Sequence, residues 1–183
     1  NVIGGLILND TNGVIDFRGE KSIGMYTYLP SKDTNRDMVN KGKILLSGAS
    51  SYGMKFSAQR RNGANPVMEN QGIITLRKNP DPNSHDKADG AVGMALAQDN
   101  TVIGGVVFDN DKAKNTSTGA INIEDNVENA VGMYVNIDSN MTNEGNININ
   151  SVASSSNKGN IGMRADSNVS KVINATTGKI NLG

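Results

Sequence analysis

The phrase "NEGNININ" at residues 143–150 places isoleucine at every second position and asparagine between the isoleucines. Related phrases recur as "TNGVIDF" at 11–17, "NKGKILL" at 40–46, "NQGIITL" at 70–76, "STGAINI" at 117–123 and "TTGKINL" at 176–182. Side chains of a β-strand alternate between its faces, so each phrase predicts a short strand with an aliphatic inner face and a polar outer face. A phrase repeated along the whole chain indicates a repeat architecture.

Two motifs alternate strictly along the chain. The first has a small polar residue two positions before a glycine, and its glycines are Gly13, Gly42, Gly72, Gly119, Gly145 and Gly178. The second is apolar-Gly-Met, and its glycines are Gly24, Gly53, Gly93, Gly132 and Gly162. Successive glycines of the first motif are 29, 30, 47, 26 and 33 residues apart. Regular order with irregular spacing is expected of stacked coils of about 30 residues whose corners carry loops of different length.

Aligning the repeats produces columns of like residues. The first motif gives one column of Ile15, Ile44, Ile74, Ile121, Ile147 and Ile180 and another of Phe17, Leu46, Leu76, Ile123, Ile149 and Leu182. The second gives the apolar residues before its glycines and then Met25, Met54, Met94, Met133 and Met163, which we interpret as core filling. Looser apolar stretches at 6–8, 67–68, 106–108 and 172–173 suggest a third strand per coil.

These columns predict an all-β fold, a right-handed parallel β-helix with three short strands per coil and about six coils. We expect residues 1–183 to form a single β-helix unit of a larger protein. A left-handed helix would need a strict six-residue period, which is missing. The alternative is an antiparallel sandwich or barrel, but few Asn-Gly hairpin signals occur. At the corners, we expect stacked asparagines to hydrogen-bond from coil to coil and the glycines to adopt positive φ.

Composition excludes several classes of function. The formal net charge is zero, so no nucleic-acid partner is expected, and absence of cysteine excludes disulfides and thiol metal sites. The single histidine, His85, rules out a multi-histidine metal site, and "DNDK" at 109–112 does not match a calcium loop. The acids Asp16, Glu124, Asp125 and Asp138 do not recur at corresponding positions. We therefore expect no cofactor, no metal and no enzymatic activity.

The alternating "N-x-G-x-I-x-L" and "S-x-G-M-Y" phrases, rich in asparagine and free of cysteine, resemble the passenger repeats of fusobacterial type V autotransporter adhesins of the RadD type. The resemblance covers the whole chain. It implies a passenger segment exported through a C-terminal outer-membrane barrel, exposed on the cell surface, and attached to a protein or glycan receptor on other bacteria or host cells.

Three apparent insertions, at 27–40, 57–70 and 77–90, are the candidate contact surface. Insertions on one side of a repeat scaffold often form its binding face. We expect Arg60, Arg61, Lys78 and His85 to contact a partner, through carboxylates or sugars. Two other functions remain open: a stalk that only spaces a distal binding tip, and a polysaccharide-active β-helix enzyme. We also expect the segment to be a monomer with some end-to-end association, because the ends of a stack expose sheet edges.

Overall fold

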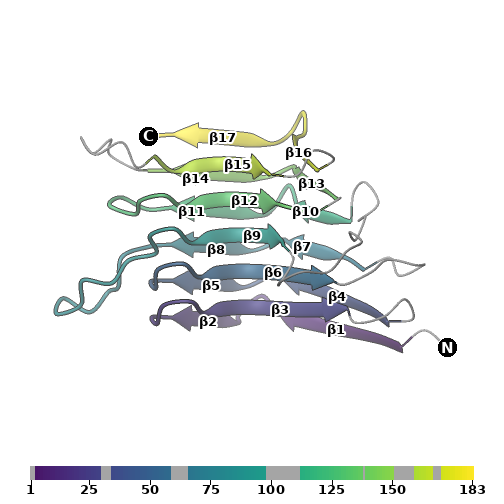
Figure 1. The fold of residues 1–183 in the computed structure, drawn as a ribbon, viewed down its shortest axis with the longest axis horizontal. Helices are drawn as coiled ribbons and strands as arrows, with labels where there is room; N and C mark the ends of the chain where they lie inside the picture. The colour runs from purple at the N-terminus through teal and green to yellow at the C-terminus, as the bar shows by residue number, and fades with distance from the viewer. Residues whose placement is uncertain are drawn as a thin grey trace.

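The computed structural model describes residues 3–29, 34–58, 66–97, 112–137, 139–150, 159–166 and 170–183. Within these ranges the chain forms 17 strands, β1 to β17. The strands pair in parallel and build three sheets, here called A, B and C (Figure 1). No helix in these ranges has the length and apolarity that crossing a membrane requires.

Each sheet takes one strand from each of the first five coils, and sheets A and B take a sixth strand. Sheet A contains β1 (Ile3–Asn9), β4 (Thr34–Asn40), β7 (Met68–Asn70), β10 (Ala113–Asn115), β13 (Asn140–Asn143) and β16 (Lys171–Asn174). Sheet B contains β2 (Val14–Phe17), β5 (Lys43–Leu46), β8 (Ile73–Leu76), β11 (Ala120–Ile123), β14 (Asn146–Ile149) and β17 (Lys179–Leu182). Sheet C contains β3 (Ile23–Leu29), β6 (Tyr52–Ala58), β9 (Val92–Leu96), β12 (Val131–Val135) and β15 (Ile161–Ala165).

The chain passes through sheets A, B and C in turn, and each coil stacks on the one before it (Figure 1). Coils one to five supply a strand to all three sheets, and the described part of coil six supplies β16 and β17. The predicted right-handed parallel β-helix with three strands per coil is confirmed.

The predicted isoleucine column stands in continuous register from Ile15 to Ile180. Its four inner members, Ile44, Ile74, Ile121 and Ile147, are fully buried. The prediction of burial is wrong at the two ends, because Ile15 is only half-buried and Ile180 is 40% exposed. Each of these two residues packs against a neighbouring coil on one side only, so half of its surface stays in contact with water.

The apolar-Gly-Met motif has a steric basis. A Cβ atom on Gly93 would lie 2.8 Å from Cγ2 of Ile121 in the next coil and 2.6 Å from the carbonyl oxygen of Gly132. The same arrangement joins Gly24 to Ile44, Gly53 to Ile74, Gly132 to Ile147 and Gly162 to Ile180. Glycine is therefore required because the isoleucine of the following coil occupies the space that a side chain would need.

The methionine column packs into the core, as expected for Met25, Met54, Met94 and Met133. The apolar residue before each glycine does not join it. Val92 and Val131 belong to a second, smaller cluster with Ala95 and Ala97, to which Tyr52 and Tyr134 add their rings. Glycine and methionine both face the core, so the strict alternation of strand faces breaks at the glycine.

An asparagine ladder runs through the corner between sheets A and B. The side-chain Nδ2 of each asparagine donates to Oδ1 of the next, at 2.7–2.8 Å, through Asn9, Asn40, Asn70, Asn115, Asn143 and Asn174. The four inner asparagines are fully buried. A second ladder joins Asn122, Asn148 and Asn181 on the outer face of sheet B. The expected coil-to-coil amide bonds are confirmed.

The corner has two lengths, which the sequence alignment missed. The ladder asparagine precedes the motif glycine by two residues in coils two, three and five, but by four in coils one, four and six. Thr11, Ser117 and Thr176, the polar residues two positions before the glycine in coils one, four and six, therefore lie exposed in the longer turns and outside the ladder. The added residues bulge outward and leave the ladder intact.

Positive φ is also found elsewhere than expected. None of the first-motif glycines has positive φ; they are needed because a Cβ atom, at Gly119 for example, would collide with the carbonyl oxygen of Asn70 in the previous coil. Lys21, Ser50, Gly90 and Asn129 have φ between 54° and 66°. Each stands three positions before the glycine of an apolar-Gly-Met motif, so the left-handed turn lies at the corner between sheets B and C.

One expectation about the insertions needs correction. The insertion predicted at 27–40 is mostly sheet, because β3 extends to Leu29 and β4 begins at Thr34. The apolar stretch at 106–108 lies outside the described residues, and the strand described for coil four in sheet A is β10. Met38, Met68 and Met141 form much of the sheet A core. The stretches at 6–8 and 172–173 lie in β1 and β16, as expected.

Asn70→Ala should lower the free energy of unfolding by roughly 2–4 kcal/mol, since it leaves Nδ2 of Asn40 and Oδ1 of Asn115 without their ladder partner and an unsatisfied buried group costs about 1–3 kcal/mol. Denaturant unfolding measures the loss. The matched control is Asn148→Ala in the outer, half-buried ladder, where water can replace the amide and the loss should stay below about 1 kcal/mol. Equal losses in the two variants would contradict a structural role for burial of the inner ladder.

Gly93→Ala should destabilise the protein by about 1–3 kcal/mol, the usual cost of overpacking a core. The added methyl group would press on Ile121 and on the backbone of Gly132. Gly159→Ala is the matched control, because no heavy atom lies within 4 Å of its Cβ position. Thermal unfolding of both variants should show a lower transition temperature for Gly93→Ala alone.

Candidate functional surface

The segment between β8 and β9, residues 77–91, forms an ordered hairpin. Lys78 and Lys87 make an isolated antiparallel bridge, and the backbone N–H of Asn79 donates to the carbonyl oxygen of Asp86 at 2.8 Å. At its tip, the N–H of Ser84 donates to the carbonyl oxygen of Asp81 at 3.0 Å, and the hydroxyl of Ser84 donates to Asp86 at 2.9 Å. The hairpin therefore presents its side chains in a defined arrangement.

The base of the hairpin is tied to the coils on both sides of it. The N–H of Ser50 in coil two donates to the carbonyl oxygen of Asp89 at 2.9 Å. The N–H of Glu128 in coil four donates to the carboxylate of Asp89 at 2.8 Å. Lys87 adds an ion pair with Asp89 at 3.3 Å. These contacts hold the hairpin against the corner between sheets B and C.

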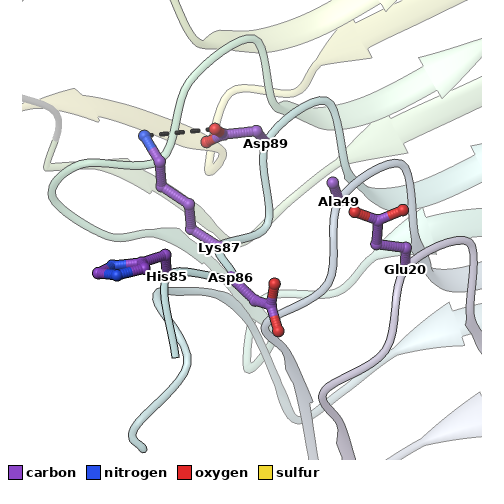
Figure 2. A pocket seen from close by; sticks show the side chains of 6 residues that line it. All are labelled: Glu20, Ala49, His85, Asp86, Lys87 and Asp89. Carbon is purple, nitrogen blue, oxygen red and sulfur yellow. Dashed lines mark ion pairs between the residues drawn. The ribbon is translucent and has the colours of Figure 1, made fainter. Parts of the chain in front are cut away.

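A shallow polar hollow of about 180 Å³ lies at this corner (Figure 2). Its lining comes from three successive coils: Glu20 from coil one, Ala49 from coil two, and His85, Asp86, Lys87 and Asp89 from coil three. Figure 2 shows Lys87 reaching toward Asp89, while the ring of His85 points away from Glu20. The hollow is lined by both acidic and basic side chains, so it is suited to contact a polar surface.

The structure places only two of the four predicted contact residues. Lys78 and His85 are both exposed on the hairpin. Arg60 and Arg61 lie outside the described residues. In chain order they stand between β6 of sheet C and β7 of sheet A, whereas the hairpin stands between β8 of sheet B and β9 of sheet C.

Acidic residues gather beside Arg77 near sheet B. Arg77 reaches across coil two and pairs with Asp16 of coil one at 3.1 Å, and Arg18 pairs with Asp16 at 3.3 Å. Glu124 lies beside Arg77; partial burial raises its pKa, although the guanidinium of Arg77 opposes the shift. The described ranges contain no group of three His, Asp or Glu side chains placed to hold a metal ion. Asp138, Asp109 and Asp111 lie outside these ranges.

A second surface, not predicted from the sequence, lies on the outer face of sheet C. All four tyrosines of the chain are on its strands: Tyr26 and Tyr28 on β3, Tyr52 on β6 and Tyr134 on β12. Lys55 lies over the ring of Tyr52, with 4.7 Å between its Nζ and the ring centroid. The tyrosine rings are thus concentrated on one of the three sheets.

Tyr134 of coil four and Arg164 and Asp166 of coil five form a hydrogen-bonded cluster on this face. The hydroxyl of Tyr134 donates to Asp166 at 3.1 Å, and Arg164 binds both carboxylate oxygens of Asp166 at 2.7 and 2.8 Å. The bonds from Arg164 hold the pKa of Asp166 below its usual range, while burial and the bond to Asp166 raise the pKa of Tyr134. The three groups therefore stay in one protonation state near neutral pH.

The sequence did not predict this cluster, because Tyr134 and Arg164 are 30 positions apart. Each follows an apolar-Gly-Met motif, whose methionine is interpreted only as core filling. The signal was the position after each motif methionine. It holds Tyr26, Lys55, Ala95, Tyr134 and Arg164, which pair in register along sheet C. A column that varies between large polar and small residues beside a constant methionine indicates an outward surface.

A protein-family model matches nearly the whole chain. The model of the BigA third pectate lyase-like domain matches residues 2–178. No curated protein and no solved structure matches the chain. The matched residues include every strand except the last, so the family pattern follows the stacked coils described above. The chain belongs to the family of the BigA third pectate lyase-like domain.

Proposed function

We propose that this chain is a cell-surface adhesin segment, part of the passenger of a type V autotransporter, that attaches its bacterium to other bacteria or to host cells. Membership of the BigA domain family is the observation that carries the proposal, since BigA is a bacterial surface adhesin. The resemblance of the repeats to RadD-type passengers makes the proposal more specific, because it suggests the type of autotransporter adhesin.

The way the coils stack supports an exported passenger. Each coil pairs with the one before it and extends both the isoleucine column and the asparagine ladder. A chain that emerges from a narrow barrel can therefore fold one coil at a time onto a finished stack. Absence of cysteine agrees with this route, because no disulfide-closed loop has to pass the barrel.

The corner loops support a role in contact. The hairpin at 77–91 is braced by Ser50 and Glu128 and carries exposed charged groups, so it can meet a partner without disturbing the core. We propose Arg60, Arg61, Lys78 and His85 as contact residues for a protein or glycan receptor. A stalk that only spaces a distal tip is the competing function, and the regular ladder would suit it equally.

Beads coated with residues 1–183 should adhere to bacterial or host cells, and Arg60→Ala with Arg61→Ala, or Lys78→Ala with His85→Ala, should weaken adhesion several-fold. Exposed loop changes usually alter stability by no more than about 0.5 kcal/mol, so unfolding temperatures should stay near that of the wild type. Lys41→Ala with Lys43→Ala is the matched control, since both lysines are exposed beside the corner between sheets A and B. Wild-type beads that fail to adhere would favour the stalk.

We also propose that the segment is not catalytic, although its family name contains pectate lyase. The carboxylates of Asp16 and Glu124 both lie beside Arg77, and Asp16 is held in ion pairs with Arg18 and Arg77. Polygalacturonate incubated with the protein should be degraded no faster than in its absence. Turnover that disappears in Glu124→Gln would overturn this proposal and establish an enzyme.

A further inference from the structure

The cluster of Tyr134, Arg164 and Asp166, with the neighbouring Ile161, forms a small built surface that we call the sheet C patch. Arg164 and Asp166 make two parallel bonds, at 2.8 Å from Nε to Oδ1 and 2.7 Å from Nη2 to Oδ2. This paired geometry fixes the directions in which the guanidinium and the carboxylate can bond to a ligand. The hydroxyl of Tyr134 adds a third polar group on the same carboxylate.

The patch also offers apolar surface. The ring of Tyr134 is half-buried and is stacked on one side by Arg164, whose Cζ lies 5.8 Å from the ring centroid. Ile161 is 40% exposed and pairs in register with Val131 of the same strand as Tyr134. Packing against Val131 and the alanines of the outer cluster supports the ring from below.

The charges of the patch compensate each other. The guanidinium carries one positive charge and Asp166, whose pKa is lowered by Arg164, carries one negative charge. An anionic ligand would be attracted by Arg164 and repelled by Asp166 at nearly the same distance, so the two interactions would nearly cancel. The patch therefore selects for uncharged ligands that can both donate and accept hydrogen bonds.

We propose that the sheet C patch binds a neutral sugar ring of a cell-surface glycan, which deepens and rests on the proposed adhesion function. Vicinal hydroxyls can donate to Asp166 and accept from Arg164, while the apolar C–H face of the ring packs on Tyr134 and Ile161. Tyrosine combines an apolar body with a polar tip and suits such a ligand. A stable protein interface needs about 800 Å² per partner, far more than a few side chains from two strands supply.

The test is binding of residues 1–183 to immobilised glycans that end in glucose, galactose or mannose, beside sialylated counterparts with the same core. Wild type should bind at least one neutral glycan in preference to its sialylated form. Tyr134→Ala should weaken that binding at least tenfold, and Arg164→Gln by a similar factor. Tyr134→Phe, which keeps the ring, should lose less than either.

Arg18→Gln is the matched control, because the exposed Arg18 pairs with Asp16 of sheet B, whereas all four tyrosines lie on the strands of sheet C. It should bind as the wild type does. Thermal unfolding of every variant separates loss of the patch from loss of the fold. Binding should change little from about 0.05 to about 0.5 M NaCl, since a compensated pair offers no net charge for salt to screen.

Three results would overturn the inference: no neutral glycan bound, a preference for sialylated glycans, or neutral binding that survives Tyr134→Ala. If cells still adhere in any of these cases, the proposed adhesion function stands while the patch assignment fails. If neutral glycans bind through Tyr134 but cells do not adhere, the patch assignment stands and the adhesion proposal fails.

Discussion

The structure depends on how closely one coil can approach the next. Parallel strands pair about 4.8 Å apart only if nothing projects between the coils at their tightest points. The chain meets this requirement with glycines that face the isoleucine of the following coil, as Gly93 faces Ile121, and with others that pass under a backbone carbonyl, as Gly119 does. Where the coils touch most closely, the side chain is reduced to a hydrogen atom.

The residues that stabilise the fold lie in the interior columns, apart from the corner loops that can vary. The columns of Ile74, Met94 and Asn70 sit in the interior and repeat from coil to coil, so each contributes to burial or to hydrogen bonding at every level. The corner between sheets B and C adds only a few small side chains to the core, such as Ala88 and Val127, and it holds a hairpin of fifteen residues braced by its neighbours. Contact surfaces can therefore change in this architecture without altering the core.

The repeats predicted the class of fold, the number of strands per coil and the register of the isoleucine and methionine columns. They did not predict which asparagines form the ladder, because turns of two lengths place Asn115 and Asn143 at different distances from their glycines. Nor did they reveal the cluster of Tyr134, Arg164 and Asp166, since its members meet only after the coils are stacked. Of the loop residues proposed for contact, Lys78 and His85 are placed on one hairpin, and their role stays a prediction.

The asparagine ladder also gives the rod a direction. Every inner amide donates its N–H toward the coil that follows, so all the amide N–H groups of the ladder point from the coil of Asn9 toward the coil of Asn174. Two rods that meet through like ends would oppose oxygen to oxygen or N–H to N–H. A joint that continues the ladder has to be head to tail, and such a heterologous contact repeats without closing. A twofold arrangement would reverse one of the two ladders and break the chain of amide bonds at the joint.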